Sequence, residues 1–257
     1  MTTPMAIIVA AGMGSRLRPL TDDRPKCLMQ VGATTILERA LRLVRAAGIP
    51  EVAVVRGSCG DKITFPDVRY FDNLAFQENN ILHSLFFAEQ AMDGGFLFSY
   101  GDIVYEAAVL EALLASPEDI AVVVDRDWQK AYEGRDLHME DEAEVVSDDE
   151  RGIRLIGKGA VPPARATGEF IGLAKFSARG AALLRQEFHR LSERYAGRAD
   201  APFQRAKEFR KAYMTDMFQE MIDRGVRVAP VSIHGGWREI DTPQDLARAN
   251  ELFSAPV

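Results

Sequence analysis

The first half of the chain alternates short apolar runs with segments in which apolar residues recur at helical spacing. The runs are typical of strands buried on both faces of a sheet; they cover residues 6–11, 51–57, 68–71, 95–102 and 119–125. The segments between them predict helices over 35–47, 79–92 and 106–115. Thr35 and Glu38 have the spacing of a capping box, and Gly48 is suited to end that first helix. This alternation predicts a parallel sheet with helices on both faces.

The pattern changes after residue 125. Strands are predicted over 151–159 and 168–177, joined by a proline-containing turn, so antiparallel strands are added to the sheet. Helices follow over 178–195 and 203–224, then a strand over 226–233. A last helix begins with Thr242 as N-cap, Pro243 as first residue and Asp245 at the N3 position. No linker separates independent domains. We therefore predict one α/β domain over 1–257, with a central mixed, mostly parallel sheet flanked by helices.

Composition and charge exclude several classes of protein. A net charge of −7 disfavours a nucleic-acid-binding surface. No apolar run is long enough to span a bilayer, and the N-terminus lacks the basic region of a signal peptide. Cys27 and Cys59 form neither a disulfide framework nor a metal-ligand spacing. A cytoplasmic protein is the resulting expectation.

The first apolar run leads into a glycine-rich loop that carries basic residues. Gly12 and Gly14 would let backbone N–H groups approach an anion closely. Arg16, Arg18 and Lys26 can neutralise several phosphate charges. A plain strand-to-helix turn would explain the glycines, but not three cations and two prolines in so short a stretch. The stretch therefore favours a phosphate-binding loop at the carboxyl end of a strand, where such sheets bind ligands.

The sequence is similar to two common nucleotide-binding motifs but matches neither completely. The third glycine of the dinucleotide-binding fingerprint would fall on Leu17. The stretch 152–159 resembles a P-loop, but Gly159 occupies the position of the magnesium-binding serine or threonine. Its intervening residues predict a strand, so we interpret this match as chance.

Asp102 and Asp241 each follow the end of an apolar or aromatic strand. Magnesium takes one or two carboxylates together with phosphate oxygens, so this pair is a candidate metal site for chemistry at a nucleotide. Taken alone, Asp102 could start a turn, and Asp241 could belong to the cap of the last helix.

Other polar groups are less informative. The four histidines show no triad or metal-ligand spacing, which disfavours nucleophilic catalysis. Trp128 and Tyr132 stand beside the acidic tract 136–150, where aromatic rings and carboxylates could surround an ammonium group. A solvated acidic loop with two packing aromatic residues is an equally good interpretation.

Together these motifs resemble a known family. The stretch 10–19, followed by Pro25 and Lys26, closely resembles the signature of the sugar nucleotidyltransferases. Later motifs resemble its cytidylyltransferase branch, which acts on phosphocholine and on small phosphonates such as 2-aminoethylphosphonate; they cover 79–85, 100–103, 168–172 and 237–241. The resemblance implies a Rossmann-like, glycosyltransferase-A-like nucleotidyltransferase domain. Residues 1–125 would bind the nucleotide, and residues 126–257 would bind the acceptor and complete the metal site.

The resemblance also implies roles for individual residues. Along the nucleotide it places Ala10, Ala11, Gly12, Gly14, Arg16, Asn80, Ser84 and Gly101. The catalytic residues would be Arg16, Lys26, Asp102 and Asp241, and the two aspartates would bind Mg²⁺. Around the acceptor it places Lys26, Trp128, Tyr132 and Glu169. The stretch 125–135 is more similar to the phosphonate enzymes than to the phosphocholine enzymes.

We therefore expect a magnesium-dependent cytidylyltransferase that transfers CMP from CTP to a small phosphonate or phosphate monoester and releases pyrophosphate. The nearest alternative is a sugar-1-phosphate nucleotidyltransferase that uses UTP, GTP or dTTP. A glycosyltransferase with a metal motif at Asp125 and Asp127, and a non-catalytic nucleotide-binding regulator, are further alternatives. The family suggests a homodimer, and no nucleic acid or membrane partner is expected.

Overall fold

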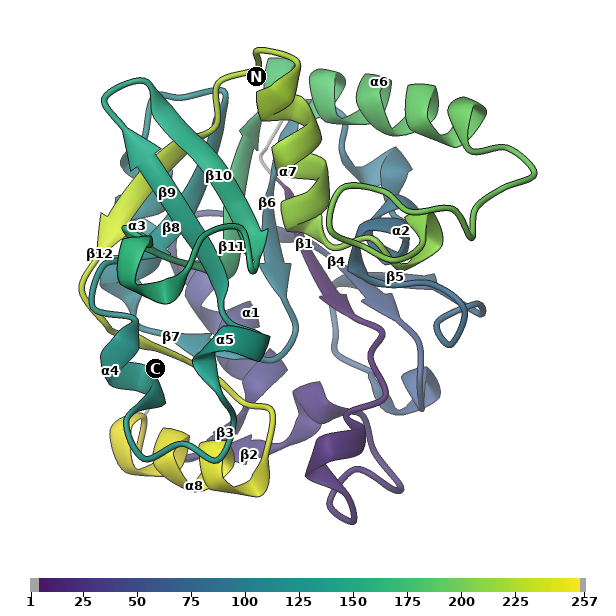
Figure 1. Ribbon diagram of the computed structural model, residues 1–257. Coiled ribbons are helices and arrows are strands. Elements are labelled where there is room, and N and C mark those ends of the chain that lie inside the picture. Colours follow the sequence, from purple (N-terminus) through teal and green to yellow (C-terminus); the bar gives the residue numbers. More distant parts are fainter. Residues whose placement is uncertain (1–4, 255–257) are drawn as a thin grey trace.

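The computed structural model describes residues 5–254, which form one mixed sheet of nine strands covered by helices on both faces (Figure 1). The main path of the sheet is β10 (Gly152–Lys158), β9 (Glu144–Asp149), β11 (Gly168–Ser177), β6 (Gly95–Tyr100), β1 (Met5–Ala10), β4 (Glu51–Arg56) and β5 (Val68–Asp72). β8 (Ile120–Asp125) also pairs with β11, and β12 (Ala229–Ile233) pairs with β8. The predicted α/β fold class is confirmed.

Strand direction decides which loops meet. β1 runs parallel to both of its neighbours, β4 and β6. β11 runs antiparallel to β6, with Ser177 opposite Gly95 and Leu173 opposite Ser99. The beginning of β11 therefore lies at the carboxyl ends of β1 and β6. A separate ribbon pairs β7 (Ile103–Tyr105) with β13 (Trp237–Glu239) and brings the C-terminal part of the chain to the same edge.

The core lies on both faces of the sheet, because successive strand residues point to opposite sides. Ala6 and Ile8 pack in the cluster that includes α1 (Ile36–Ala46) and α3 (Ala107–Ala115). Ile7 and Val9 pack in the cluster with α2 (Ile81–Phe86), α6 (Ala178–Arg194) and α7 (Met214–Asp223). No helix within residues 5–254 is long and apolar enough to cross a bilayer.

Several local predictions are confirmed. The Thr35 side chain accepts a hydrogen bond from the Glu38 backbone N–H (3.1 Å), which caps α1. α8 (Pro243–Leu252) begins with the predicted capping box of Thr242 and Asp245. Residues 152–158 form a strand, so the P-loop resemblance there is a chance match, as predicted.

Two predicted helices are shorter than expected. The segment 79–92 forms α2 only over Ile81–Phe86, followed by a turn and a short 3-10 helix. The segment 203–224 is α-helical only over Met214–Asp223. Apolar or aromatic residues recur at a spacing close to that of a helix, at positions 203, 206, 209 and 212. These residues nevertheless do not form an α-helix. The carbonyl of Ala212 accepts from the Leu82 N–H (3.3 Å), so this segment docks on the start of α2.

The acidic tract is not simply a solvated loop. The short helix α4 (Gln129–Tyr132) precedes the tract, whose first part carries the short helix α5 (Met139–Glu142) and whose last part forms β9. β9 pairs with both β10 and β11, so it lies between the two strands that the sequence predicted to be joined by a turn. Glu144, Val145 and Val146 are buried, because this strand lies inside the sheet.

Candidate active site

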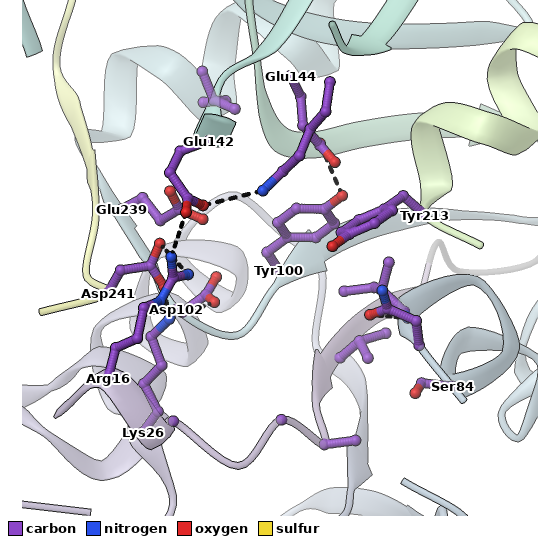
Figure 2. A pocket seen from close by; sticks show the side chains of 18 of the residues that line it. Arg16, Lys26, Ser84, Tyr100, Asp102, Glu142, Glu144, Tyr213, Glu239 and Asp241 are labelled. Carbon is purple, nitrogen blue, oxygen red and sulfur yellow. Dashed lines mark hydrogen bonds and ion pairs between the residues drawn. The ribbon is translucent and has the colours of Figure 1, made fainter. Parts of the chain in front are cut away.

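Loops from both halves of the chain line one cavity at the carboxyl ends of β1 and β6 (Figure 2). The N-terminal half contributes Ala11, Gly12, Gly14, Arg16, Lys26, Asn79, Asn80, Ser84, Tyr100 and Asp102, among others. The C-terminal half contributes Glu142, Glu144, Lys158, Glu169, Tyr213, Trp237, Glu239 and Asp241. The fold therefore brings together most of the residues that the sequence singles out.

The glycine-rich loop is shaped by Gly14, which has a left-handed φ of 60°. A Cβ at this position would lie 3.1 Å from Cβ of Lys26, so the loop folds tightly against that lysine. The Thr21 hydroxyl donates to the Gly14 carbonyl (2.8 Å) and holds the turn. This turn places Arg16 and Lys26 on the same wall of the cavity (Figure 2).

Lys26 joins the two predicted metal ligands. Its Nζ lies 2.8 Å from Oδ2 of Asp102 and 2.5 Å from Oδ1 of Asp241. Burial alone would lower the pKa of Lys26, but the two carboxylates raise it well above its ordinary value. Burial alone would likewise raise the pKa of Asp241, but Lys26 lowers it. Lys26 and Asp241 are therefore both charged at neutral pH.

Arg16 spans the gap between the two halves of the site. Its guanidinium lies 2.7 Å from Glu142 and 2.9 Å from Asp241 (Figure 2). About half of this side chain is exposed, with 44% of its surface accessible, so an anion in the cavity can reach it.

A third carboxylate completes an acidic cluster. Oxygens of Asp102, Glu239 and Asp241 lie within 4.8 Å of one another. Burial raises the pKa of Glu239 well above its ordinary value, and the neighbouring Asp241 and Asp102 raise it further. Oδ1 of Asp102 is buried and has no hydrogen-bond partner among residues 5–254. Hard oxygen ligands with excess negative charge fit a divalent cation such as Mg²⁺. Alternation along the chain from Glu239 to Asp241 is the signal that could have found this third residue.

At the opposite end of the cavity, an amide network orients Asn79 and Ser84. The buried Asn73 donates through Nδ2 to Oδ1 of Asn79 (2.8 Å) and to the Ser84 hydroxyl oxygen (2.9 Å). Asn79 donates back to Oδ1 of Asn73 (3.2 Å). The predicted residue Asn80 lines the cavity, but its side-chain oxygen caps α2 by accepting from Ile81 N–H (2.8 Å).

Sequence reasoning predicted the strand β10 but missed its partner β9, and so missed the wall of the cavity that the two strands form. Lys158 lies directly opposite Glu144 in the strand register and donates to Glu142 (3.0 Å). The Tyr100 hydroxyl donates to Glu144 (3.0 Å), as Figure 2 shows. Burial raises the pKa of Glu144 to about 7, an effect that Lys158 and Tyr100 reduce. The apolar pair Val145 and Val146 within the acidic tract was the available signal for this strand.

The predicted acceptor residues are only partly brought together. Trp128 is 2% exposed, packs with Tyr132, Ala143 and Val145, and does not line the cavity. This arrangement matches the packing interpretation of Trp128. The Tyr132 hydroxyl donates to Oε1 of the buried Glu169 (2.7 Å), and Glu169 does line the cavity. Tyr132 thus reaches the site through Glu169.

Other predicted residues lie beside the cavity. Ala10 packs in the core on the face of the sheet that α1 covers. Gly101 lies against β1, where a Cβ would come within 2.7 Å of the Val9 carbonyl oxygen. Arg18 is 64% exposed and pairs with Asp22 on the surface. None of these three residues lines the cavity.

The domain family described as MobA-like NTP transferase domain matches residues 6–171, about two thirds of the chain. The chain belongs to this family. It is therefore a member of a nucleotidyltransferase family, and the predicted resemblance is confirmed.

Several similar proteins are named as cytidylyltransferases. The chain is 32% identical to the CTP:phosphoglutamine cytidylyltransferase of Campylobacter jejuni over 252 residues, 94% of this chain and 97% of the relative. It is 30% identical to the 2-aminoethylphosphonate cytidylyltransferase of Lancefieldella rimae over 192 residues, 72% of this chain and 71% of the relative. The solved structure of the CTP:phosphocholine cytidylyltransferase of Streptococcus pneumoniae aligns with a TM-score of 0.72 at 20% identity, over 97% of this chain and 99% of that chain. That structural similarity confirms the fold.

Proposed function

We propose that the protein is a magnesium-dependent cytidylyltransferase that transfers CMP from CTP to a short phosphonate or phosphate monoester carrying an ammonium group. The observation that carries this proposal is the single cavity in which the cationic loop faces the carboxylates of Asp102, Glu239 and Asp241. The names of the relatives support CTP as the nucleotide, because both relatives are named as cytidylyltransferases.

The residues of the N-terminal half suit a nucleoside triphosphate. The loop at Gly12 and Gly14 offers backbone N–H groups, while Arg16 and Lys26 supply positive charge for the phosphates. Asn79 and Ser84 present hydrogen-bonding groups at the end of the cavity where we place the base. Lys158, in the wall formed by β9 and β10, adds a third cation on the acceptor side.

The acceptor already carries an anionic oxygen, so attack on the α-phosphorus needs no strong general base. The bond from that oxygen to phosphorus forms as the bond to pyrophosphate breaks. The cavity contributes positioning and charge neutralisation, chiefly through Arg16 and Lys26. When bound, Mg²⁺ would be held by Asp102, Glu239 and Asp241, and would neutralise phosphate charge.

The acceptor end of the cavity suits a cation. Glu142, Glu144 and Glu169 all line it. Phosphocholine and 2-aminoethylphosphonate, which the names of similar proteins give as acceptors, both carry a positively charged nitrogen. The sugar part of a sugar phosphate would bring no positive charge to this end of the cavity.

The alternative metal motif of a glycosyltransferase has no support in the geometry. Asp125 is buried and accepts from the Trp237 indole N–H (2.8 Å) and the Gly235 N–H (2.9 Å). Asp127 pairs with Lys130 (2.8 Å). Neither aspartate lines the cavity.

The test is pyrophosphate release from CTP, UTP, GTP and dTTP with Mg²⁺. Each nucleotide is offered with phosphocholine, 2-aminoethylphosphonate and glucose 1-phosphate. We expect release only with CTP and an acceptor that carries an ammonium group. Preference for UTP, GTP or dTTP with glucose 1-phosphate would instead establish the sugar-1-phosphate alternative. A cytoplasmic location and a homodimer stay predictions, which fractionation and sedimentation would check.

A further inference from the structure

A second, smaller cavity adjoins the first. Glu169, Trp237 and Glu239 line both cavities, so these side chains form the boundary between them. Beyond the boundary lie Tyr132 and three arginines, Arg135, Arg238 and Arg248. Nothing in the transfer of CMP itself requires this second cavity, so its chemistry concerns the part of the acceptor that does not react.

Glu169 offers a carboxyl group at the boundary, and a bound ammonium group would favour its charged form. Its Oε1 accepts from Tyr132, whereas Oε2 is buried and has no hydrogen-bond partner within residues 5–254. The residue is 4% exposed, and burial raises the pKa of its carboxyl to about 8. A buried carboxylate oxygen without a partner is unfavourable, and a ligand ammonium group would relieve this condition.

The arginines offer positive charge on the far side of Glu169. Arg135 is already paired, with its guanidinium 2.7 Å from Asp245. Arg238 donates to the Trp237 carbonyl (2.6 Å), and Arg248 donates to the Gly134 carbonyl (2.7 Å). Neither of these two has a carboxylate partner among residues 5–254. Burial lowers the pKa of Arg238, the charge of Asp125 partly offsets this, and repulsion from Arg248 and Arg135 lowers the pKa further. The net direction is downward, so an anion here would be stabilised.

We propose that the acceptor carries a carboxylate as well as an ammonium group, in the manner of an α-amino acid whose side chain ends in a phosphonate or phosphate. Its ammonium would bind Oε2 of Glu169, and its carboxylate would bind Arg238 with support from Arg248. This inference rests on the proposed function, whose acceptor class it narrows. Arg135 lies 3.8 Å from both Glu239 and Asp241, so the second cavity is close to the reacting phosphates. We therefore expect a short acceptor.

Two matched pairs of phosphonates test this inference. The first pair is 2-aminoethylphosphonate and 2-amino-3-phosphonopropanoate, and the second is 3-aminopropylphosphonate and 2-amino-4-phosphonobutanoate. Within each pair the compounds differ only by a carboxylate on the carbon that bears nitrogen. With CTP and Mg²⁺, we expect kcat/KM to be about tenfold or more higher for the amino acid in at least one pair, the size of effect that a charge-assisted hydrogen bond gives.

An arginine variant tests whether Arg238 causes the preference for the amino acid over its amine partner. Arg238→Gln should lower kcat/KM for the preferred amino acid about tenfold more than for its amine partner. Arg179→Gln, at an arginine that is 79% exposed on α6, is the control and should change neither value. If the amine is the better acceptor in both pairs, or if Arg238→Gln affects both compounds equally, the inference is wrong.

Failure of the proposed function has a different signature. Pyrophosphate release with the amines alone supports cytidylyltransfer and overturns only the zwitterionic acceptor. If no acceptor gives release, the proposed function fails, and calorimetry with the same four compounds decides the inference separately. Tighter binding of an amino acid than of its amine, lost in Arg238→Gln, would then support the second cavity as a zwitterion site, and equal binding would overturn it.

Discussion

The side-chain nitrogen of Lys26 lies 2.5 Å from a carboxylate oxygen of Asp241, a residue 215 positions later in the chain. The same nitrogen lies 2.8 Å from Asp102, so one ammonium group joins two of the three carboxylates that we propose as metal ligands. Lys26 and the proposed metal ion would therefore neutralise the same buried charge. This arrangement predicts that Mg²⁺ stabilises the protein more strongly when the Lys26 ammonium group is removed.

Lys26→Met should lower the free energy of unfolding by about 3 kcal/mol, because it leaves buried carboxylates without their partner. Added Mg²⁺ should restore part of this loss, since the freed oxygens of Asp102 and Asp241 become available to the ion. Urea unfolding with and without Mg²⁺ measures both effects. Lys130→Met is the control, because Lys130 is 71% exposed and pairs only at the surface. Equal stabilisation of wild type and Lys26→Met by Mg²⁺ would contradict the shared arrangement.

Asp102→Asn should reduce kcat at least about 100-fold and raise the Mg²⁺ concentration needed for half-maximal rate, because a metal-ligating carboxylate is lost. Titration of Mg²⁺ during pyrophosphate release measures both quantities. The matched control is Asp23→Asn, at an aspartate that is 65% exposed near the same loop and pairs with Arg24. Near-normal turnover in Asp102→Asn would rule out the metal assignment.

The parts of the site that lie next to a recognisable strand end could be predicted from the sequence. Asp102 follows β6, and the loop with Arg16 and Lys26 follows β1, so the parallel sheet alone requires them to meet. The N-cap at Thr35 and the capping box at Thr242 were equally predictable, because each depends only on residues three positions apart.

The rest depends on contacts between distant segments. β9 was hidden because charged residues surround its buried pair Val145 and Val146, and charge density outweighs so short an apolar signal. Lys158 becomes a site residue only because β9 and β10 pair with Glu144 opposite it. The segment 203–213 was assigned to a helix because its apolar spacing is helical, whereas its backbone carbonyls instead accept from the start of α2.

Asn73→Asp should lower the preference for CTP over UTP. In the wild type, the Ser84 oxygen accepts a hydrogen from Asn73 (2.9 Å). The Ser84 hydroxyl donates only at long range, to Oδ1 of Asn79 (3.4 Å), so its hydrogen can turn toward a base. Cytosine has an acceptor at N3, whereas uracil has a donor there. An aspartate at 73 would accept from Ser84 and leave the serine oxygen to accept from the base. We expect the ratio of kcat/KM for CTP to that for UTP to fall about tenfold.

Ser84→Ala serves as the comparison for Asn73→Asp. It removes both the donor and the acceptor, so the ratio should fall without any gain in kcat/KM for UTP. Because a ratio of two substrates is measured on the same preparation, partial unfolding of Asn73→Asp does not affect the outcome. An unchanged ratio in both variants would show that Ser84 does not contact the base.

Glu169→Gln should make stability less dependent on pH. Burial raises the pKa of the Glu169 carboxyl from 4.5 to about 8 in the folded protein, so the folded state retains a proton that the unfolded chain has released. This group's contribution to stability is full below pH 4.5 and declines as pH rises to about 8. Relative to wild type, the free energy of unfolding of the variant should therefore rise by about 3–5 kcal/mol between pH 5 and pH 8.5, at about 1.4 kcal/mol for each pKa unit.

Urea unfolding at several pH values measures the difference, with the exposed Glu193→Gln as control. Parallel pH profiles for wild type and Glu169→Gln would mean that Glu169 is ionised throughout this range, and that a cation other than the acceptor's ammonium already neutralises it.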